Sequence, residues 1–491
     1  MNSLLENLKQ DTNYSYTENG GRTHTSTLNK VYDMFAFGGS YRSRTDEDCI
    51  LLFKQALEED EFLAMKCLFY LRDVRGGQGE RRFFRVCFRW LANEYPYIVD
   101  RNLVNVSAFG RWDDLIYSCI GTKAETGALL LIKEQLALDV KCETPSLLAK
   151  WLPSENASSD TTKAMANVIR SYLGLTHKQY RKLLSGLRTK INVLEKLMSS
   201  NQWDKIVFDK IPSKAGMIYR NAFARRDIIA KQYEAFIKDE NTKVNADTLY
   251  PYEIVRKARV GQLSDLEVET LEKYWDNQKD YLNGKPCKML CVCDTSGSMA
   301  MTWHSGGNVL PIDIAISLSM YCAERVGEPF KNHYISFSSR PQLIHIDGVN
   351  FVDKVKRIYK TNLCENTNIE ATFDLLKDVS LKAKPEDRLD TVIIISDMEI
   401  DCMTTAYYSE DELATDMELI RKEWKAAGLE CPKLVYWNVN ARNNNILDLG
   451  PNVSFVSGAS PVLFESVLTG KTGIDLMLDK LLGSERYRDV K

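Results

Sequence analysis

The sequence predicts a chain of class α + α/β, with an α-helical N-terminal half joined to a doubly wound, Rossmann-like C-terminal domain. From Asp46 to Tyr281 apolar residues recur at helical spacing, without a convincing alternating strand. From Cys287 onward short apolar runs alternate with amphipathic segments, which is typical of a parallel sheet covered by helices. Since 491 residues exceed what one hydrophobic core normally holds, we expect two or three domains.

We divide the chain into a polar N-terminal segment (1–45), a helical domain (46–284) and an α/β domain (285–491). The N-terminal segment is expected to be weakly structured. Its polar run from Asn19 to Thr27 is interpreted either as a contact for a partner or as a capped lead into a helix near Leu28 to Phe37. The segment from Asn283 to Pro286 is the expected hinge between the two larger domains.

The helical half contains paired segments of about 15 residues joined by short turns, which favours a HEAT-like α-solenoid, although no repeat of fixed period is found. Its expected helices are 46–58, 62–71, 81–90, 122–140, 161–173, 176–190, 216–223, 225–238, 249–260 and 266–282. The α/β domain is expected to contain strands 287–293, 332–337, 342–346, 390–396, 433–438 and 453–457. Its expected helices are 310–325, 350–360, 368–383, 410–427 and 472–482.

A glycine-rich break separates two of the expected helices, at Arg72 to Glu80 (RDVRGGQGE). No Gly-Lys-Ser/Thr follows, so the segment is not a Walker A loop, and a helix-to-helix turn is the favoured interpretation. Arginines gather near the start of the second helix, where a phosphate could be received, unless Asp73 and Glu80 pair with some of them. These arginines are Arg72, Arg75, Arg81, Arg82, Arg85 and Arg89.

The composition is that of an ordinary globular protein, with 44% hydrophobic and 27% charged residues. There is no apolar run of membrane-spanning length, and the hydrophilic start differs from a secretory signal. The 12 cysteines form no Cys-x-x-Cys pair, and several lie in apolar runs, so we expect reduced core thiols in a cytoplasmic protein. The five histidines show no zinc-enzyme spacing.

The charge distribution is uneven. Residues 160–231 hold 15 basic and 5 acidic residues, whereas the whole chain has a net charge of −3. Such a local excess is either a surface for a polyanion such as RNA or a set of solvated helix faces. If the surface binds RNA, the candidate contacts are the cations of the expected helix 176–190. They are Lys178, Arg181, Lys182, Arg188 and Lys190.

Oxygen-bearing side chains follow the expected strand 287–293. Asp294, Ser296 and Ser298 are spaced two residues apart, and Gly297 is expected to let the backbone turn sharply. Carboxylate and hydroxyl oxygens suit a hard cation such as Mg²⁺, and the carboxyl ends of strands are where α/β sheets usually bind ligands. Two later residues can complete the site, Thr367 before a helix and Asp397 at the end of strand 390–396.

This Asp-x-Ser-x-Ser … Thr … Asp pattern resembles the metal-ion-dependent adhesion site of von Willebrand factor A domains, all five positions of which match. A helical-repeat half followed by such a domain resembles the TROVE/Ro ribonucleoprotein family, and in particular a TROVE-like group of uncharacterised proteins. The matching segments are LFYLRDVRGGQGERRFFR (68–85), FGRWDDL (109–115), IPSKAGMIYRNAF (211–223), YPYEIVRKA (250–258), CDTSGSM (293–299), NTNIEATFD (366–374) and SDMEID (396–401).

The resemblance implies a function and a set of partners. Ro proteins bind the single-stranded ends of misfolded RNA and small structured RNAs, so the resemblance implies an RNA-binding scaffold here. The adhesion site implies Mg²⁺ or another divalent cation such as Mn²⁺, whose coordination is completed by an acidic side chain of a partner protein. Four nearby residues are expected either to line the docking face or to pack for stability. They are Met299, Met301, Trp303 and His304.

Two alternatives stay open beside this non-enzymatic RNA-binding scaffold. One is a metal-dependent protein-interaction scaffold without RNA. The other is an enzyme that uses Mg²⁺ with Asp294 and Asp397 for phosphoryl chemistry, which is disfavoured because no base, nucleophile-base pair or nucleotide loop is evident.

Overall fold

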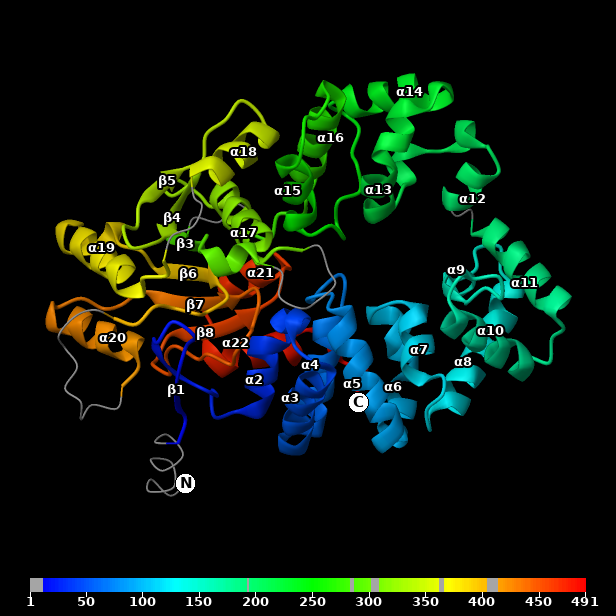
Figure 1. Ribbon diagram of the computed structural model, residues 1–491, viewed down its shortest axis with the longest axis horizontal. Helices are drawn as coiled ribbons and strands as arrows, with labels where there is room; N and C mark the ends of the chain where they lie inside the picture. Colours follow the sequence, from blue (N-terminus) through cyan, green and yellow to red (C-terminus); the bar gives the residue numbers. More distant parts are fainter. Residues whose placement is uncertain (1–11, 192–193, 283–286, 302–308, 362–365, 404–413) are drawn as a thin grey trace. The chain divides into compact units, whose positions relative to one another are not determined.

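The C-terminal part of the chain is built on a six-stranded sheet with the order β5-β4-β3-β6-β7-β8 (Figure 1). All neighbouring strands pair in parallel except β5, which runs antiparallel to β4. Strand order reverses between β3 and β6, which is the switch point where ligands bind in doubly wound sheets. The strands are β3 (Met289–Asp294), β4 (His333–Phe337), β5 (Leu343–His345), β6 (Thr391–Ser396), β7 (Lys433–Asn438) and β8 (Val453–Ser457).

Strands β3 and β8 are covered on both faces, because every residue of each strand is buried. This coverage explains why β3 is a continuous apolar run up to Asp294 rather than an alternating one. Helix α17 packs against β3, β4 and β6, and α22 packs against β8. The helices of this part are α17 (Pro311–Arg325), α18 (Phe351–Thr361), α19 (Ile369–Lys382), α20 (Asp416–Ala426), α21 (Leu463–Val467) and α22 (Gly473–Leu481).

The computed structural model describes residues 12–191, 194–282, 287–301, 309–361, 366–403 and 414–491. The expected hinge at 283–286 lies outside these residues. Between Asp46 and Asp276 the described chain is helical, with short 3₁₀ turns at Trp203–Lys205 and Phe208–Lys210. Its helices are α3 (Asp46–Glu59), α4 (Glu61–Arg72), α5 (Arg81–Glu94), α6 (Pro96–Phe109), α7 (Trp112–Cys119), α8 (Glu125–Lys141), α9 (Leu148–Trp151), α10 (Asp160–Tyr172), α11 (His177–Lys190), α12 (Leu194–Ser199), α13 (Ser213–Arg225), α14 (Asp227–Lys238), α15 (Pro251–Arg259) and α16 (Asp265–Asp276).

Local sequence explains where several of these helices begin. Thr45, Thr176 and Ser264 each form a capping box, in which the hydroxyl accepts a backbone N–H and the third helical residue bonds back to the cap. Helices that follow one another in the chain pack together, as in the pairs α5–α6, α6–α7, α7–α8 and α13–α14. The predicted class, a helical N-terminal half followed by a domain with a mixed, mainly parallel sheet, is confirmed.

The chain forms two compact units. Unit 1 contains residues 1–67 and 249–485, and unit 2 contains residues 68–248 and 486–491. Helices α15 and α16 belong to unit 1, where α15 packs on α17 and both helices pack on α18. The division into 1–45, 46–284 and 285–491 stays a prediction about sequence segments, and it differs from these packing units.

The expectation of a weakly structured N-terminal segment is wrong for residues 12–45. Strands β1 (Tyr14–Tyr16) and β2 (Arg22–His24) form a hairpin, and α2 (Lys30–Phe37) follows as the predicted helix. Figure 1 shows α2 beside β8, and the Phe455 amide of β8 donates to the Tyr32 hydroxyl at 2.8 Å. Within the polar run, the Thr23 hydroxyl donates to the Ile446 carbonyl at 2.8 Å and Asn19 Nδ2 to the Glu399 carbonyl at 2.7 Å, so the run contacts loops of the chain's own α/β domain rather than serving only as a helix lead.

The glycine-rich break between α4 and α5 is a turn, as predicted. A Cβ on Gly77 would lie 1.9 Å from the carbonyl oxygen of Tyr70, so only glycine fits there. Two of the nearby arginines are bound by carboxylates of the FGRWDDL segment: Arg72 Nη2 lies 2.6 Å from Asp114 Oδ2, and Arg85 contacts both Asp113 and Asp114. These two arginines are therefore structural and are not placed to receive a phosphate.

Asp73 has a different partner, near the end of the chain. Its carboxylate accepts hydrogen bonds from Arg486 and from the Tyr487 hydroxyl, the latter at 3.0 Å. The predicted local pairing of Asp73 with the arginines of its own segment is therefore replaced by a pairing across 413 residues within unit 2.

Two predictions from composition can be compared with the structure. The cysteines of the apolar runs, which are Cys67, Cys87, Cys291, Cys293 and Cys322, are all buried and free. Among the described residues, no helix combines the length and apolarity needed to cross a membrane. The cytoplasmic location stays a prediction.

Replacing Asp114 by alanine should destabilise unit 2 strongly. The carboxylate and Arg72 are both fully buried, so D114A leaves an uncompensated guanidinium, at a cost of about 3–5 kcal/mol. Urea unfolding followed by circular dichroism measures this. The control E134A, at an exposed position of α8, should leave the midpoint unchanged, and an equally small effect of D114A would contradict the assignment.

Candidate metal centre and candidate nucleic-acid interface

The five predicted metal ligands belong to unit 1, at the carboxyl edge of the sheet. Asp294 ends β3 and Asp397 directly follows β6, and these two strands pair in register from Met289 to Cys293. The two carboxylates therefore come from the neighbouring strands that flank the switch point. Both side chains are fully buried.

Asp294 is held by the residues around it. Its Oδ2 accepts a hydrogen bond from the Ser396 hydroxyl at 2.5 Å, and its Oδ1 accepts one from the Ser296 amide at 2.8 Å. Burial and the neighbouring Asp397 carboxylate raise the pKa of Asp294 to about 7. Burial also raises the pKa of Asp397, against the opposing effect of the Arg442 guanidinium.

The two serines complete a cluster with these carboxylates. Ser296 Oγ and Ser298 Oγ lie 3.1 Å apart, and the Ser298 side chain hydrogen-bonds to Asp397. The prediction that the turn requires Gly297 is wrong. The φ of Gly297 is not in the left-handed region, and a Cβ there would meet no described atom within 4 Å. The structure thus brings Asp294, Ser296, Ser298 and Asp397 together.

Thr367 is connected to the same edge less directly. Its side chain is buried, and its hydroxyl donates to the Glu399 carbonyl at 2.9 Å and lies 3.2 Å from Asp401 Oδ1. Among the described residues, no hydrogen bond joins Thr367 to the other four predicted ligands. Its oxygen nevertheless retains lone pairs that can accept a water or a cation.

The donor set fits a hard divalent cation. Two buried carboxylates repel each other, and serine hydroxyls add neutral oxygen ligands, which are the ligands that Mg²⁺ and Mn²⁺ bind. No group of three or more His, Cys, Asp or Glu residues among the described residues is arranged to hold a metal. An ion here would therefore be bound by hydroxyl groups together with the two carboxylates.

Four side chains at this edge were missed from the sequence. Ser396 orients Asp294, as described above, and Arg442 Nη2 contacts Asp397 Oδ2 at 3.1 Å. Glu399, whose pKa burial raises, accepts a hydrogen bond from Asn443 Nδ2 at 2.9 Å. Arg442 and Asn443 follow the predicted strand 433–438, so the rule that polar residues after parallel strands meet at one edge could have found them.

The four residues proposed for the docking face do not share one environment. Met299 is buried, so its side chain packs in the core, whereas Met301 is 52% exposed. Trp303 and His304 lie outside the described residues.

The candidate RNA contacts lie on α11 in unit 2, and all of them except Arg188 are exposed. Lys178, Arg181 and Lys182 lie at positions i, i+3 and i+4 of the helix, so they form one outward stripe. Arg181 Nε lies 3.3 Å from the His177 carbonyl, whereas neither lysine has a hydrogen bond or ion pair within the described part of the chain.

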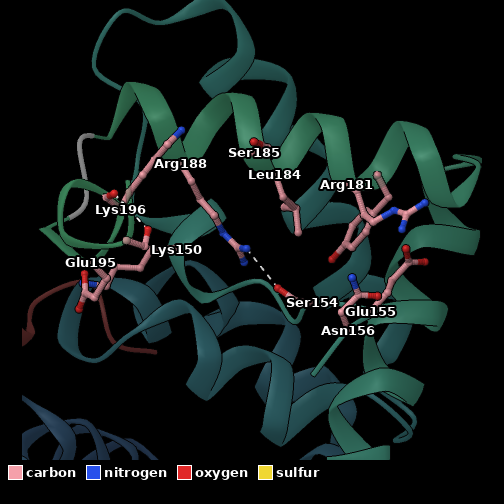
Figure 2. A pocket seen from close by; sticks show the side chains of 12 residues that line it. Lys150, Ser154, Glu155, Asn156, Arg181, Leu184, Ser185, Arg188, Glu195 and Lys196 are labelled. Atoms are coloured by element: carbon pink, nitrogen blue, oxygen red, sulfur yellow. Dashed lines mark hydrogen bonds and ion pairs between the residues drawn. The ribbon is translucent and has the colours of Figure 1, made fainter. Parts of the chain in front are cut away.

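The other two cations bind the protein itself. Arg188 is half-buried and donates to the carbonyls of Ala149 at 2.8 Å and Leu152 at 2.9 Å, and Figure 2 shows its guanidinium reaching Ser154. Burial lowers the pKa of Arg188. Lys190 Nζ donates to the Val140 carbonyl at 2.9 Å and the Cys142 carbonyl at 3.2 Å, at the end of α8.

A cavity of about 580 Å³ lies beside α11 (Figure 2). Lys150, Arg181 and Lys196 bring positive charge to it, and Glu155 and Glu195 bring negative charge. Glu155 is engaged by Arg170 and His177, and Glu195 lies 3.8 Å from Lys150. The exposed stripe of α11 is therefore continuous with a polar cavity through Arg181.

Comparison with known proteins shows the family of this chain. The chain belongs to the family described as domain of unknown function DUF2828, which matches residues 17–118 and 124–292. The domain of unknown function DUF7788 matches residues 288–483. An uncharacterised protein of Acanthamoeba polyphaga mimivirus, L728, is 31% identical over 510 residues, which cover 94% of this chain and 85% of the relative.

A solved structure also resembles this chain. The Ro (RSR) protein of Deinococcus radiodurans aligns with 93% of the chain and 100% of its own, at 12% identity and a TM-score of 0.41. At this TM-score the alignment gives no correspondence between residues. The resemblance to TROVE/Ro proteins in the sequence motifs therefore stays a resemblance.

Substitutions on α11 should separate structural from exposed cations. R188A removes charged hydrogen bonds to two carbonyls, so unit 2 should lose about 1–3 kcal/mol of stability. K182A, one and a half turns earlier, should have no measurable effect. Urea unfolding of both variants tests this, and equal stability of R188A and K182A would show that the carbonyl contacts do not hold α11.

Proposed function

We propose that this chain is a non-enzymatic scaffold that docks an acidic protein segment through a divalent cation in unit 1 and binds RNA through unit 2. The docking site is supported by one observation above the others: Asp294 and Asp397 are buried together at the switch point of the sheet, with Ser296 and Ser298 hydrogen-bonded between them. A cation bound there offsets the mutual repulsion of the two carboxylates.

Mg²⁺ or Mn²⁺ would be held by Ser296 and Ser298 directly, and by Asp294, Asp397 and Thr367 directly or through water. Bound mostly by neutral hydroxyls, the ion keeps enough positive charge to attract a carboxylate from a partner protein. The protein's own residues position these oxygens: Ser396 orients Asp294, and Arg442 orients Asp397.

Mn²⁺ should stabilise the wild-type protein but not D294N. At a concentration about 100 times the dissociation constant, the ion should raise the melting temperature of the wild type by about 5 °C. In EDTA, D294N should be at least as stable as the wild type, because it removes one of two repelling buried carboxylates. Differential scanning calorimetry measures both effects.

The matched control is D390N, at an exposed position just before β6 on the opposite edge of the sheet. It should respond to Mn²⁺ as the wild type does. If the wild type gains no stability from Mn²⁺ or Mg²⁺, the metal-dependent docking function is wrong.

The RNA-binding part of the proposal is supported by the exposed stripe of Lys178, Arg181 and Lys182 on α11 and by the local excess of basic residues. Arg188 and Lys190 contribute less, since their side chains already bind carbonyl groups. Lysine and arginine on an exposed helix face recognise the RNA backbone rather than its sequence, so binding should depend on phosphate charge.

Reversing the three charges of the stripe Lys178, Arg181 and Lys182 should weaken RNA binding and its salt dependence. For a labelled 20-nucleotide oligouridine, the slope of log K against log salt should fall by about 2 in K178E/R181E/K182E, because three phosphate contacts are lost. Fluorescence anisotropy at several salt concentrations measures this, with a structured hairpin RNA as a second probe.

The control variant K123E/K133E/K141E changes the same charge at exposed positions on and before α8. It should bind both RNAs nearly as the wild type does. If neither RNA binds at low salt, while Mn²⁺ still stabilises the protein, the function is that of a metal-dependent protein scaffold without RNA. Turnover of RNA or nucleotide that depends on Asp397 would instead revive an enzymatic role.

A further inference from the structure

The surface next to the candidate metal centre already holds a carboxylate from a distant part of the chain. Glu18 lies in the loop between β1 and β2. Its Oε1 accepts a hydrogen bond from Asn443 Nδ2 at 3.1 Å, and its Oε2 accepts one from Arg442 Nη1. Both oxygens of this carboxylate are thus bound by two consecutive residues that follow β7.

Arg442 connects this carboxylate to the candidate metal centre. While Nη1 binds Glu18, Nη2 of the same guanidinium lies 3.1 Å from Asp397 Oδ2. Although burial acts to lower the pKa of Arg442, the carboxylates of Asp397, Glu18 and Glu399 raise it, so the side chain stays charged. One cation therefore lies between a buried carboxylate on one side and an exposed carboxylate on the other.

The groups that bind Glu18 are themselves fixed. Asn443 Nδ2 also donates to Glu399 Oε1 at 2.9 Å, and Glu399 is fully buried. The side chain of Arg442 is only 14% exposed. Because buried carboxylates hold both donors in place, the two donors form a preorganised site for one carboxylate.

The backbone that carries Glu18 is fixed as well. The Thr17 hydroxyl donates to the Ile400 carbonyl at 2.6 Å, and the Glu18 amide donates to Glu399 Oε2 at 2.7 Å. At Gly21 a Cβ would lie 2.8 Å from Ile400 Cγ1 and 2.9 Å from its carbonyl oxygen, so the close approach requires glycine. These contacts do not involve the Glu18 carboxylate, so they persist when that side chain moves away.

The Glu18 side chain is the displaceable member of this arrangement. It is 48% exposed, and an ion pair with one partner so exposed contributes little stability. A second carboxylate arriving from solvent can therefore replace it on Arg442 and Asn443 while the loop backbone stays in place. The Glu18 side chain therefore occupies the site formed by Arg442 and Asn443 without being needed for the stability of the fold.

We propose that Arg442 and Asn443 form a carboxylate-binding subsite beside the metal centre, which Glu18 fills in the free chain and an acidic side chain of a docked protein fills in the complex. The partner that fits is a protein segment with two acidic residues, one for the cation and one for this subsite. The role of the subsite in binding a partner rests on the proposed docking function. Carboxylate binding by Arg442 and Asn443 does not itself require a metal.

The test uses the full-length chain and fluorescein-labelled hexaglutamate, a peptide that offers neighbouring carboxylates. Its affinity is measured by anisotropy in Mn²⁺ and again in EDTA. The variants are E18Q, R442Q and E18Q/R442Q, and E47Q is the matched control, since Glu47 is exposed at the start of α3. E18Q keeps the shape of the side chain and all backbone hydrogen bonds of the loop, so it should fold normally.

E18Q should bind hexaglutamate about two- to fivefold more tightly than the wild type, since the competing carboxylate is gone. R442Q should bind about tenfold more weakly, and E18Q should give no gain in the R442Q background. E47Q should match the wild type. Equal or weaker binding by E18Q would overturn the subsite, and would leave Glu18 with a structural role only.

The two conditions separate this proposal from the docking function. If binding is the same in Mn²⁺ and in EDTA, but the E18Q and R442Q effects persist, the subsite stands and metal-dependent docking fails. If Mn²⁺ strengthens binding but E18Q and R442Q both match the wild type, docking stands and the subsite fails.

Discussion

The burial of Asp294 and Asp397 on neighbouring parallel strands is the constraint around which this edge of the protein is arranged. Parallel strands end at the same edge of a sheet, so two aspartates that end adjacent strands must lie close together. Burial raises the pKa of Asp294 to about 7, and the repulsion between the two poorly screened carboxylates adds to the effect. Every hydrogen bond to them therefore has an electrostatic role as well as a geometric one.

The two aspartates receive different kinds of hydrogen-bond donor, which offset this repulsion. Asp294 receives neutral donors, the Ser396 hydroxyl and the Ser296 amide, whereas Asp397 receives the charged guanidinium of Arg442. Arg442 in turn binds the Glu18 carboxylate through its other terminal nitrogen, while the backbone of the N-terminal loop is held separately by Thr17 and by the Glu18 amide. A segment that looks like an unstructured polar leader thereby becomes part of the site, because one guanidinium binds carboxylates on two sides.

The sequence predicted those features that depend on local patterns. Strands β7 and β8 were predicted with their observed bounds, because short segments rich in Val and aromatic residues between polar turns are typical of strands. The candidate ligands Asp294 and Asp397 were predicted from the ends of β3 and β6, and the structure brings both to one edge, while metal binding there stays a prediction. The hairpin of β1 and β2 was missed, because three-residue strands carry no periodicity and the hairpin's contacts with the rest of the chain, such as that with Ile446, lie more than 400 residues away.

The charge count had a similar limit. It correctly located basic residues on α11, but it treated five cations as equivalent when two of them, Arg188 and Lys190, bind carbonyl groups outside this helix. In the arginine-rich turn, local reasoning suggested Asp73 and Glu80 as partners, whereas the packing of α5 on α7 brings Asp113 and Asp114 to Arg85. Sequence reveals the number of charges, but only tertiary packing decides which of them remain available to a ligand.

The two proposed activities should respond differently to the salt concentration. Binding of RNA to exposed lysines releases counterions and weakens steeply with salt. Coordination of a divalent cation by buried carboxylates is screened far less, because the charges lie within the protein rather than in water. A chain with both sites can therefore lose its RNA in rising salt while its metal centre stays occupied, so the two functions can be regulated and measured independently.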